Sequence, residues 1–124
     1  MNKVIIEGNL HFIFVTSRYQ EVFYGESKKE AEEIIRTKLT ENGIESFHIE
    51  CLGFIVLVSV RLNEGKSPRN IANIVRRAGK DVINMIKKYR PCGMQHLLME
   101  NYYVSTEMPS GTRILQFIEE EINR

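Results

Sequence analysis

Short stretches of β-branched and aromatic residues alternate with longer stretches of helical periodicity, and this alternation constrains the fold more than any other feature. Strands are predicted over residues 9–16, 44–51, 54–62 and 101–106. Helices are predicted over residues 27–42 and 67–89 and from residue 110 to near the end of the sequence. The predicted element order is therefore β-α-β-β-α-β-α.

The predicted helix starts rest on capping residues. Ser27 with Glu30 three positions later forms a capping-box pattern, so the first helix is expected to begin there. Ser67 followed by Pro68 predicts the start of the second helix, because proline is favoured at the first helical position. That helix is expected to end before Pro91.

The first six elements are those of a split βαβ, ferredoxin-like fold, in which two helices cover one face of a four-stranded antiparallel sheet. The seventh is an added C-terminal helix. We therefore predict an α+β protein, and 124 residues suit a single domain spanning 1–124. Ferredoxin-like folds host many unrelated functions, so the fold alone does not indicate one.

The composition is that of an ordinary globular protein, with 43% hydrophobic and 27% charged residues. No apolar run approaches the roughly 18 residues of a membrane span, so a cytoplasmic location without membrane contact is expected. Cys51 and Cys92 stand outside any CxxC or CxxH spacing, so they are expected to be reduced packing residues. No cofactor is predicted.

Positive charge is concentrated in residues 66–90, where only Asp81 is acidic. The basic residues in this range are Lys66, Arg69, Arg76, Arg77, Lys80, Lys87, Lys88 and Arg90. The last helix is acidic instead, with Glu119, Glu120 and Glu121. Such asymmetry within a small domain points to a side that faces a polyanion.

The helical periodicity of residues 67–89 separates apolar from basic side chains. The predicted buried face consists of Ile71, Ile74, Val75, Ala78, Val82, Met85 and Ile86. On the opposite side Arg69, Arg76, Lys80 and Lys87 fall within about 40°, flanked by Lys66, Arg77 and Lys88. A merely solvated face usually mixes signs, as the 27–42 helix does, because ion pairs four residues apart stabilise an exposed helix. We therefore favour nucleic acid as the partner, with a solvated face as the alternative.

Tyrosines could stack on unpaired bases, as single-strand binders require. The candidates are Tyr19, Tyr24, Tyr89, Tyr102 and Tyr103. Tyr19 is singled out, because it stands beside Arg18 in the loop after the first strand. Packing at the rim of the core is the alternative for all of them.

Four stretches resemble single-tyrosine, His-hydrophobic-His insertion-sequence transposases. Residues 11–19 (HFIFVTSRY) resemble the opening strand of that family, and residues 57–60 (LVSV) with 66–68 (KSP) resemble its passage from the metal-binding strand into the next helix. Residues 102–106 (YYVST) resemble its fourth strand, and residues 113–121 (RILQFIEEE) its catalytic C-terminal helix. The resemblance implies a transposase-like domain that binds hairpin DNA as a homodimer.

The resemblance also implies that the catalytic residues have been replaced. The two metal-binding histidines of the family fall on Gly53 and Ile55, its tyrosine nucleophile falls on Phe117, and its metal-binding glutamine falls on Glu121. Glycine and isoleucine offer no ligand atom, and phenylalanine has no hydroxyl with which to attack a phosphate. We therefore expect no enzyme activity and no metal site, and a non-catalytic, regulatory role in binding a DNA or RNA hairpin or single strand.

Two other functions stay open. A nuclease or transposase with a relocated active site would use residues such as His48 and Glu50, which share one face of a strand, or His96. A protein-binding or small-ligand-binding ferredoxin-like module would leave the basic face incidental. The apolar strand at residues 11–16 is expected to be an edge that dimerisation covers.

Overall fold

The computed structural model describes residues 8–61 and 66–123 and has the predicted element order. The strands are β1 (Asn9–Val15), β2 (Phe47–Leu52), β3 (Ile55–Arg61) and β4 (Tyr103–Ser105). The helices are α1 (Gly25–Glu41), α2 (Pro68–Arg77), α3 (Gly79–Ile86) and α4 (Gly111–Ile122), and a short 3-10 helix, η1 (Ser17–Tyr19), follows β1. The predicted strand end at residue 62 and the turn over 63–65 lie outside the described residues.

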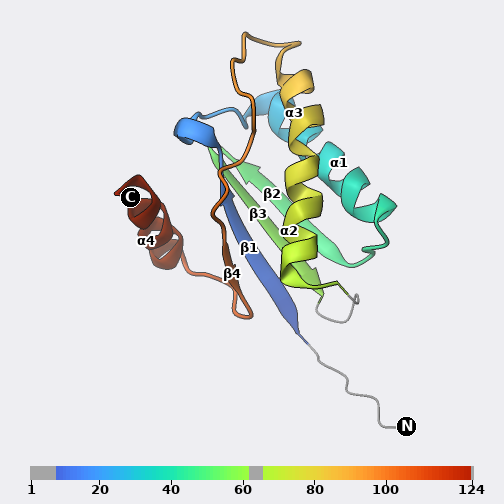
Figure 1. Ribbon diagram of the computed structural model, residues 1–124, viewed down its shortest axis with the longest axis vertical. Helices are drawn as coiled ribbons and strands as arrows, with labels where there is room; N and C mark the ends of the chain where they lie inside the picture. Colours follow the sequence, from blue (N-terminus) through green and yellow to red (C-terminus); the bar gives the residue numbers. More distant parts are fainter. Residues whose placement is uncertain (1–7, 62–65, 124) are drawn as a thin grey trace, which may run out of the picture.

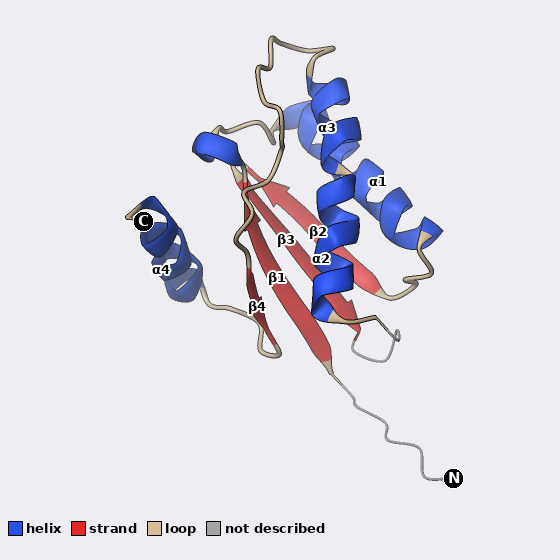
Figure 2. Cartoon of the chain, in the orientation of Figure 1, coloured by secondary structure: helices blue, strands red, loops and turns tan. Residues whose placement is uncertain are grey.

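The strands form one antiparallel sheet in the order β2-β3-β1-β4. Helices α1, α2 and α3 cover one face of the sheet, and α4 lies on the opposite face (Figures 1 and 2). This confirms the predicted α+β, ferredoxin-like fold with an added C-terminal helix. None of the described helices is long and apolar enough to span a membrane.

The prediction that residues 11–16 form an edge strand is wrong. β1 pairs with β3 along its whole length and with β4 over residues 11–13, so it lies inside the sheet. The two edges of the sheet are β2 and β4. An apolar stretch is safe in this central position, because it offers no free hydrogen-bonding groups to another chain.

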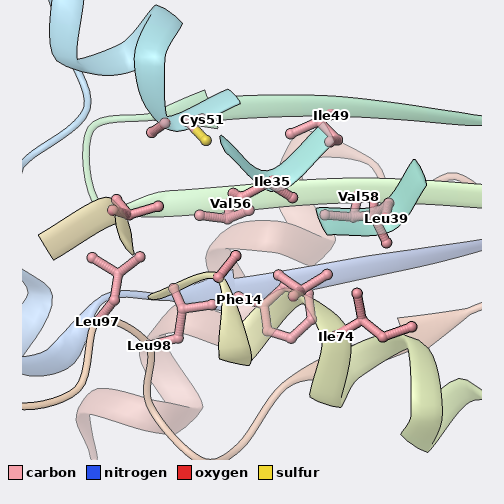
Figure 3. Packing of buried hydrophobic residues seen from close by; sticks show 14 of the residues in the cluster. Phe14, Ile35, Leu39, Ile49, Cys51, Val56, Val58, Ile74, Leu97 and Leu98 are labelled. Atoms are coloured by element: carbon pink, nitrogen blue, oxygen red, sulfur yellow. The ribbon is translucent and has the colours of Figure 1, made fainter. Parts of the chain in front are cut away.

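The main core lies between the sheet and the three helices on its covered face. Alternate residues of the strands point into it, as the two-residue period of a strand requires. Figure 3 shows Phe14, Val56 and Val58 of the sheet with Ile35 and Leu39 of α1, Ile74 of α2, and Leu97 and Leu98 of the segment before β4. Cys51 is buried in this core and Cys92 packs against it.

Two predicted helix boundaries differ from the structure. Helix α1 begins at Gly25, and Ser27 is its third residue, where its Oγ accepts the main-chain N–H of Tyr24 at 3.4 Å. The capping interaction therefore lies three residues earlier than the Ser27–Glu30 pattern indicated. The predicted 67–89 helix is divided at Ala78, whose N–H is shared between the carbonyls of Ile74 and Val75 at 3.3 and 3.2 Å. It ends at Ile86.

Candidate functional site

The basic side chains of α2 and α3 lie on the exposed side of these helices. The seven residues of the predicted apolar face, from Ile71 to Ile86, are all buried. All seven predicted basic residues from Lys66 to Lys88 are exposed. The prediction of two opposed faces is confirmed, because burial of the apolar stripe against the sheet leaves the charges in solvent.

The segment that leads from α3 to β4 passes beside these helices and is tied to the end of β1. The main-chain N–H of Ser17 donates to the carbonyl of Leu97 at 2.8 Å, and the N–H of Met99 donates to the carbonyl of Val15 at 2.9 Å. On the helix side Leu97 lies against Gly79, where a Cβ atom would come within 3.1 Å of the leucine Cβ. The absence of a side chain at Gly79 therefore lets this segment lie close to the helix.

A groove of about 460 Å³ separates α2 and α3 from this segment. Its helix side is lined by Asn73, Arg76, Arg77, Gly79 and Lys80. Its other side is lined by Gln95, His96, Leu97 and Leu98. We call this hollow the helix groove. It contains three cationic side chains and no carboxylate.

A second groove, of about 380 Å³, lies on the other side of the same segment. It is lined by Ser17, Arg18 and Gln20 of the turn after β1 and by Gly93, Met94, Gln95 and His96. We call it the turn groove. Gln95 and His96 line both grooves, so Arg18 and the basic residues of α2 and α3 are brought to two sides of one short segment.

The turn that carries Arg18 has an unusual backbone. Arg18 and Tyr19 both have positive φ angles, of 58° and 54°. Each such residue with a side chain costs on the order of 1–2 kcal/mol, so two in succession are held only where surrounding contacts enforce them. Here Thr16 contributes, because its buried hydroxyl donates to the carbonyl of Gln20 at 2.7 Å. Strain of this kind concentrates at functional sites.

The remaining predicted basic residues lie outside the two grooves. Lys66 lines a smaller hollow together with Arg77, so it extends the positive surface towards the start of α2. Lys88 lies instead beside Glu30 and Glu33 of α1. Arg69 and Lys87 are exposed but are not among the residues that line either groove.

Tyr19 does not share a site with its neighbour Arg18. Its ring packs edge-on against Phe54, with 5.9 Å between the ring centroids, in the smaller apolar cluster under α4. The same cluster contains Ile55 and Phe117. Gly53 lies in the turn between β2 and β3 with φ of 59°, a conformation that favours glycine, and forms a bridge with Phe23 of the main core. Two of the four positions that correspond to catalytic residues in the resembled transposases therefore belong to one mainly apolar cluster.

Glu121, the fourth of these positions, is buried rather than solvated. The residue is 4% exposed, and Asn101 Nδ2 donates to its carboxylate at 3.4 Å. Burial raises the pKa of the Tyr19 hydroxyl, and the nearby negative charge of Glu121 raises it further. This carboxylate is thus held beside a tyrosine and an amide. Within the described ranges no group of three or more His, Cys, Asp or Glu side chains could hold a metal ion.

The histidines that were considered for a relocated site lie apart from one another. His48 and Glu50 are on the edge strand β2, where they pair with Ser59 and Leu57 of β3. His96 lies in the two grooves. His11, which the sequence had not singled out, is buried on β1 and its Nδ1 lies 2.7 Å from Ser59 Oγ.

Gln95, which lines both grooves, is among the groove residues that sequence reasoning missed. It belongs to a segment without periodicity, and nothing in its local sequence distinguishes it from any exposed polar residue. Gln95 is brought to the helices by the close approach of Leu97 to Gly79, a contact between segments distant in the sequence. The unusually small residue in the middle of an amphipathic helix was the one available signal.

Comparison with solved structures identifies a candidate transposase and a tyrosine transposase with this fold. A crystal structure of a candidate transposase from Deinococcus radiodurans R1 matches 98% of this chain over 98% of its own length, with a TM-score of 0.79 and 20% sequence identity. A REP-associated tyrosine transposase, solved bound to a REP hairpin, matches 99% of this chain over 67% of its own length, with a TM-score of 0.52 and 10% identity. The chain matches no protein-family model and no curated protein at a significant level. The expected transposase-like fold is confirmed.

Proposed function

We propose that this protein binds structured or single-stranded nucleic acid, such as a DNA or RNA hairpin, through the helix groove and the turn groove without cleaving it. The observation that carries the proposal is the grouping of Arg18, Arg76, Arg77 and Lys80 around two adjoining grooves whose lining includes no acidic residue. Cationic side chains spaced along a groove suit the phosphates of a nucleic-acid strand.

The contrast with α1 supports a role for these charges in binding. On α1, Lys28 pairs with Glu32, Lys29 with Glu26, and Arg36 with Glu33. Among the described residues, none of the four groove cations forms an ion pair with a carboxylate. A helix that leaves its positive charges unpaired repels itself, and a bound polyanion would relieve that repulsion.

The proposal that binding occurs without catalysis rests on the cluster under α4. Phe117 offers no nucleophile, and neither Gly53 nor Ile55 offers an atom that could hold a divalent metal. Apolar side chains pack where the resembled transposases would assemble a metal site. The second of the structurally similar transposases is described bound to a REP hairpin, which supports a hairpin as the first ligand to test.

The test is a titration of the protein with fluorescent hairpin DNA and hairpin RNA over a range of salt concentrations. Four phosphate contacts would give a slope of log K against log salt near −3, so raising salt from about 50 to about 200 mM would weaken binding roughly 50- to 150-fold. The double variant Arg76→Ala/Lys80→Ala should flatten the slope by about 1.5 and lose affinity for all sequences similarly. Both side chains are exposed, so the fold should survive.

The matched control is Lys29→Ala/Arg36→Ala, which removes the same number of positive charges from α1. Its slope and affinity should stay close to those of the unchanged protein, because α1 lies outside both grooves. Equal losses in the two double variants would show that net charge alone governs binding. If Arg76→Ala/Lys80→Ala left affinity and slope unchanged, the helix would be a solvated face and the proposal would fail.

We also propose that the protein forms a homodimer through the side of the molecule that carries β4 and α4. Apolar side chains are exposed there on both elements and on the connection between them: Val104, Met108, Leu115 and Ile122. β4 is also a sheet edge with only one strand neighbour. Pairing with a second copy would cover this edge, and the resemblance to dimeric transposases supports the same assembly.

A further inference from the structure

Gln95 and His96 occupy a distinctive place, because they are the residues that line both the helix groove and the turn groove. On one side of them stand Arg76, Arg77 and Lys80, and on the other side stands Arg18. A strand with phosphates in both grooves would pass close to these two side chains, because they line both grooves.

The backbone beneath these side chains is held in place from several directions. The Ser17 hydroxyl donates to the carbonyl of His96 at 2.6 Å, and the Ser17 N–H donates to the carbonyl of Leu97 at 2.8 Å. Leu97 and Leu98, which follow directly, are buried in the main core at 2% and 5% exposure. The segment therefore presents Gln95 and His96 to solvent from a support that the core and β1 fix.

The chemistry of the two side chains differs from that of their surroundings. The flanking cations suit phosphates, which position a strand but carry no sequence information. The glutamine amide carries both donors and an acceptor and can form paired hydrogen bonds with the edge of an adenine. The imidazole of histidine can stack on an unpaired base or form a hydrogen bond with its edge.

We infer that Gln95 and His96 are the residues that determine sequence specificity, by contacting bases of a strand whose phosphates lie in the two grooves. This inference rests on the proposed function, because it requires nucleic acid in the grooves. It adds that binding is sequence-selective, and that selection occurs at the divide between the grooves. An unpaired adenine is the base best suited to Gln95.

The test begins with a pool of DNA and RNA hairpins that have randomised loops and randomised flanking single strands. Sequences retained by the unchanged protein are enriched, and the affinity of the enriched sequence is compared with that of a scrambled one. Loss of a good base contact should reduce this discrimination roughly 5- to 150-fold in Gln95→Ala, and in the same direction in His96→Ala. The affinity for the scrambled ligand should fall less than the affinity for the enriched sequence in either variant, and the salt slope should stay close to that of the unchanged protein, because neither variant removes a phosphate-contacting cation.

Gln116→Ala is the matched control, since Gln116 is an exposed glutamine on α4, on the opposite face of the sheet. It should leave both the discrimination and the affinity unchanged. Enrichment of no sequence by the unchanged protein would overturn the inference while leaving salt-dependent groove binding intact. Discrimination equal to that of the unchanged protein in both Gln95→Ala and His96→Ala would also overturn the inference. If no pool member binds at all, the proposed function fails with it.

Discussion

Glu32 connects α1 to the outer edge of the sheet, and its removal should measurably destabilise the protein. Its Oε2 atom accepts the main-chain N–H of Cys51 on edge strand β2 at 2.9 Å and lies 2.6 Å from Lys28 Nζ. The same contact occupies a hydrogen-bonding group that an edge strand would otherwise offer to another chain. The variant to test is Glu32→Ala.

The magnitude follows from the two interactions lost. A hydrogen bond to a charged group contributes about 1.5–3 kcal/mol, and a partly exposed ion pair within a helix adds up to about 0.5 kcal/mol. Because the Glu32 side chain is 17% exposed and water would replace part of the loss, we expect about 2 kcal/mol in the free energy of unfolding. For 124 residues this corresponds to a fall of about 8 °C in Tm.

Urea unfolding followed by circular dichroism measures this difference, with Glu33→Ala as the control. Glu33 also pairs with an arginine on α1, but its side chain is 66% exposed and the pair should contribute less than about 0.5 kcal/mol. Comparable losses in the two variants would refute the assigned role of the Cys51 contact.

The pH dependence gives an independent check. Burial alone would raise the pKa of Glu32, but hydrogen bonds from Lys28 and the Cys51 N–H outweigh it and lower the pKa. The folded state therefore binds the proton more weakly than the unfolded chain, in which the pKa of a glutamate is about 4.3. The stability difference between the unchanged protein and Glu32→Ala should be full above that pH and shrink as the pH falls through the lowered pKa. A difference that grows on acidification would contradict this reasoning.

Three further outcomes are expected. Phe117→Tyr should form no covalent adduct with hairpin DNA in Mg²⁺ or Mn²⁺, because Gly53 and Ile55 still supply no metal ligand; a shifted band on a denaturing gel would contradict this. Burial raises the pKa of the Cys51 thiol to about 12, so iodoacetamide at pH 8 should leave it unmodified in the native protein while the half-buried Cys92 reacts, and equal rates would count against the burial. Light scattering should return the mass of a dimer at micromolar concentration, and a monomer mass would refute the proposed assembly.

The sequence was sufficient for the fold and for one wall of the candidate site. Local periodicity and capping residues located the helices and strands, and the one-sided charge of residues 66–88 identified the basic face. The predicted ferredoxin-like order already places the first strand between the third and the fourth, so the expectation that residues 11–16 form an edge was inconsistent with the predicted fold. The sequence could not locate the 93–98 segment. This segment is positioned by main-chain bonds to Ser17 and by the close approach of Leu97 to Gly79. Tyr19 was predicted to lie beside Arg18 at the interface, but its ring packs against Phe54.

The contact between the end of β1 and the segment before β4 affects when the two proposed binding grooves can form during synthesis. Thr16 and Leu98 form a bridge between segments far apart in the chain, and both grooves depend on that junction. Such non-local pairings form late, because the intervening chain must be ordered first. A nascent chain that has emerged only through α3 carries the basic helix but not the segment that completes the grooves. The proposed sequence-selective binding would therefore require the chain through the 93–98 segment, whereas nonspecific attraction of polyanions to the basic helices would not.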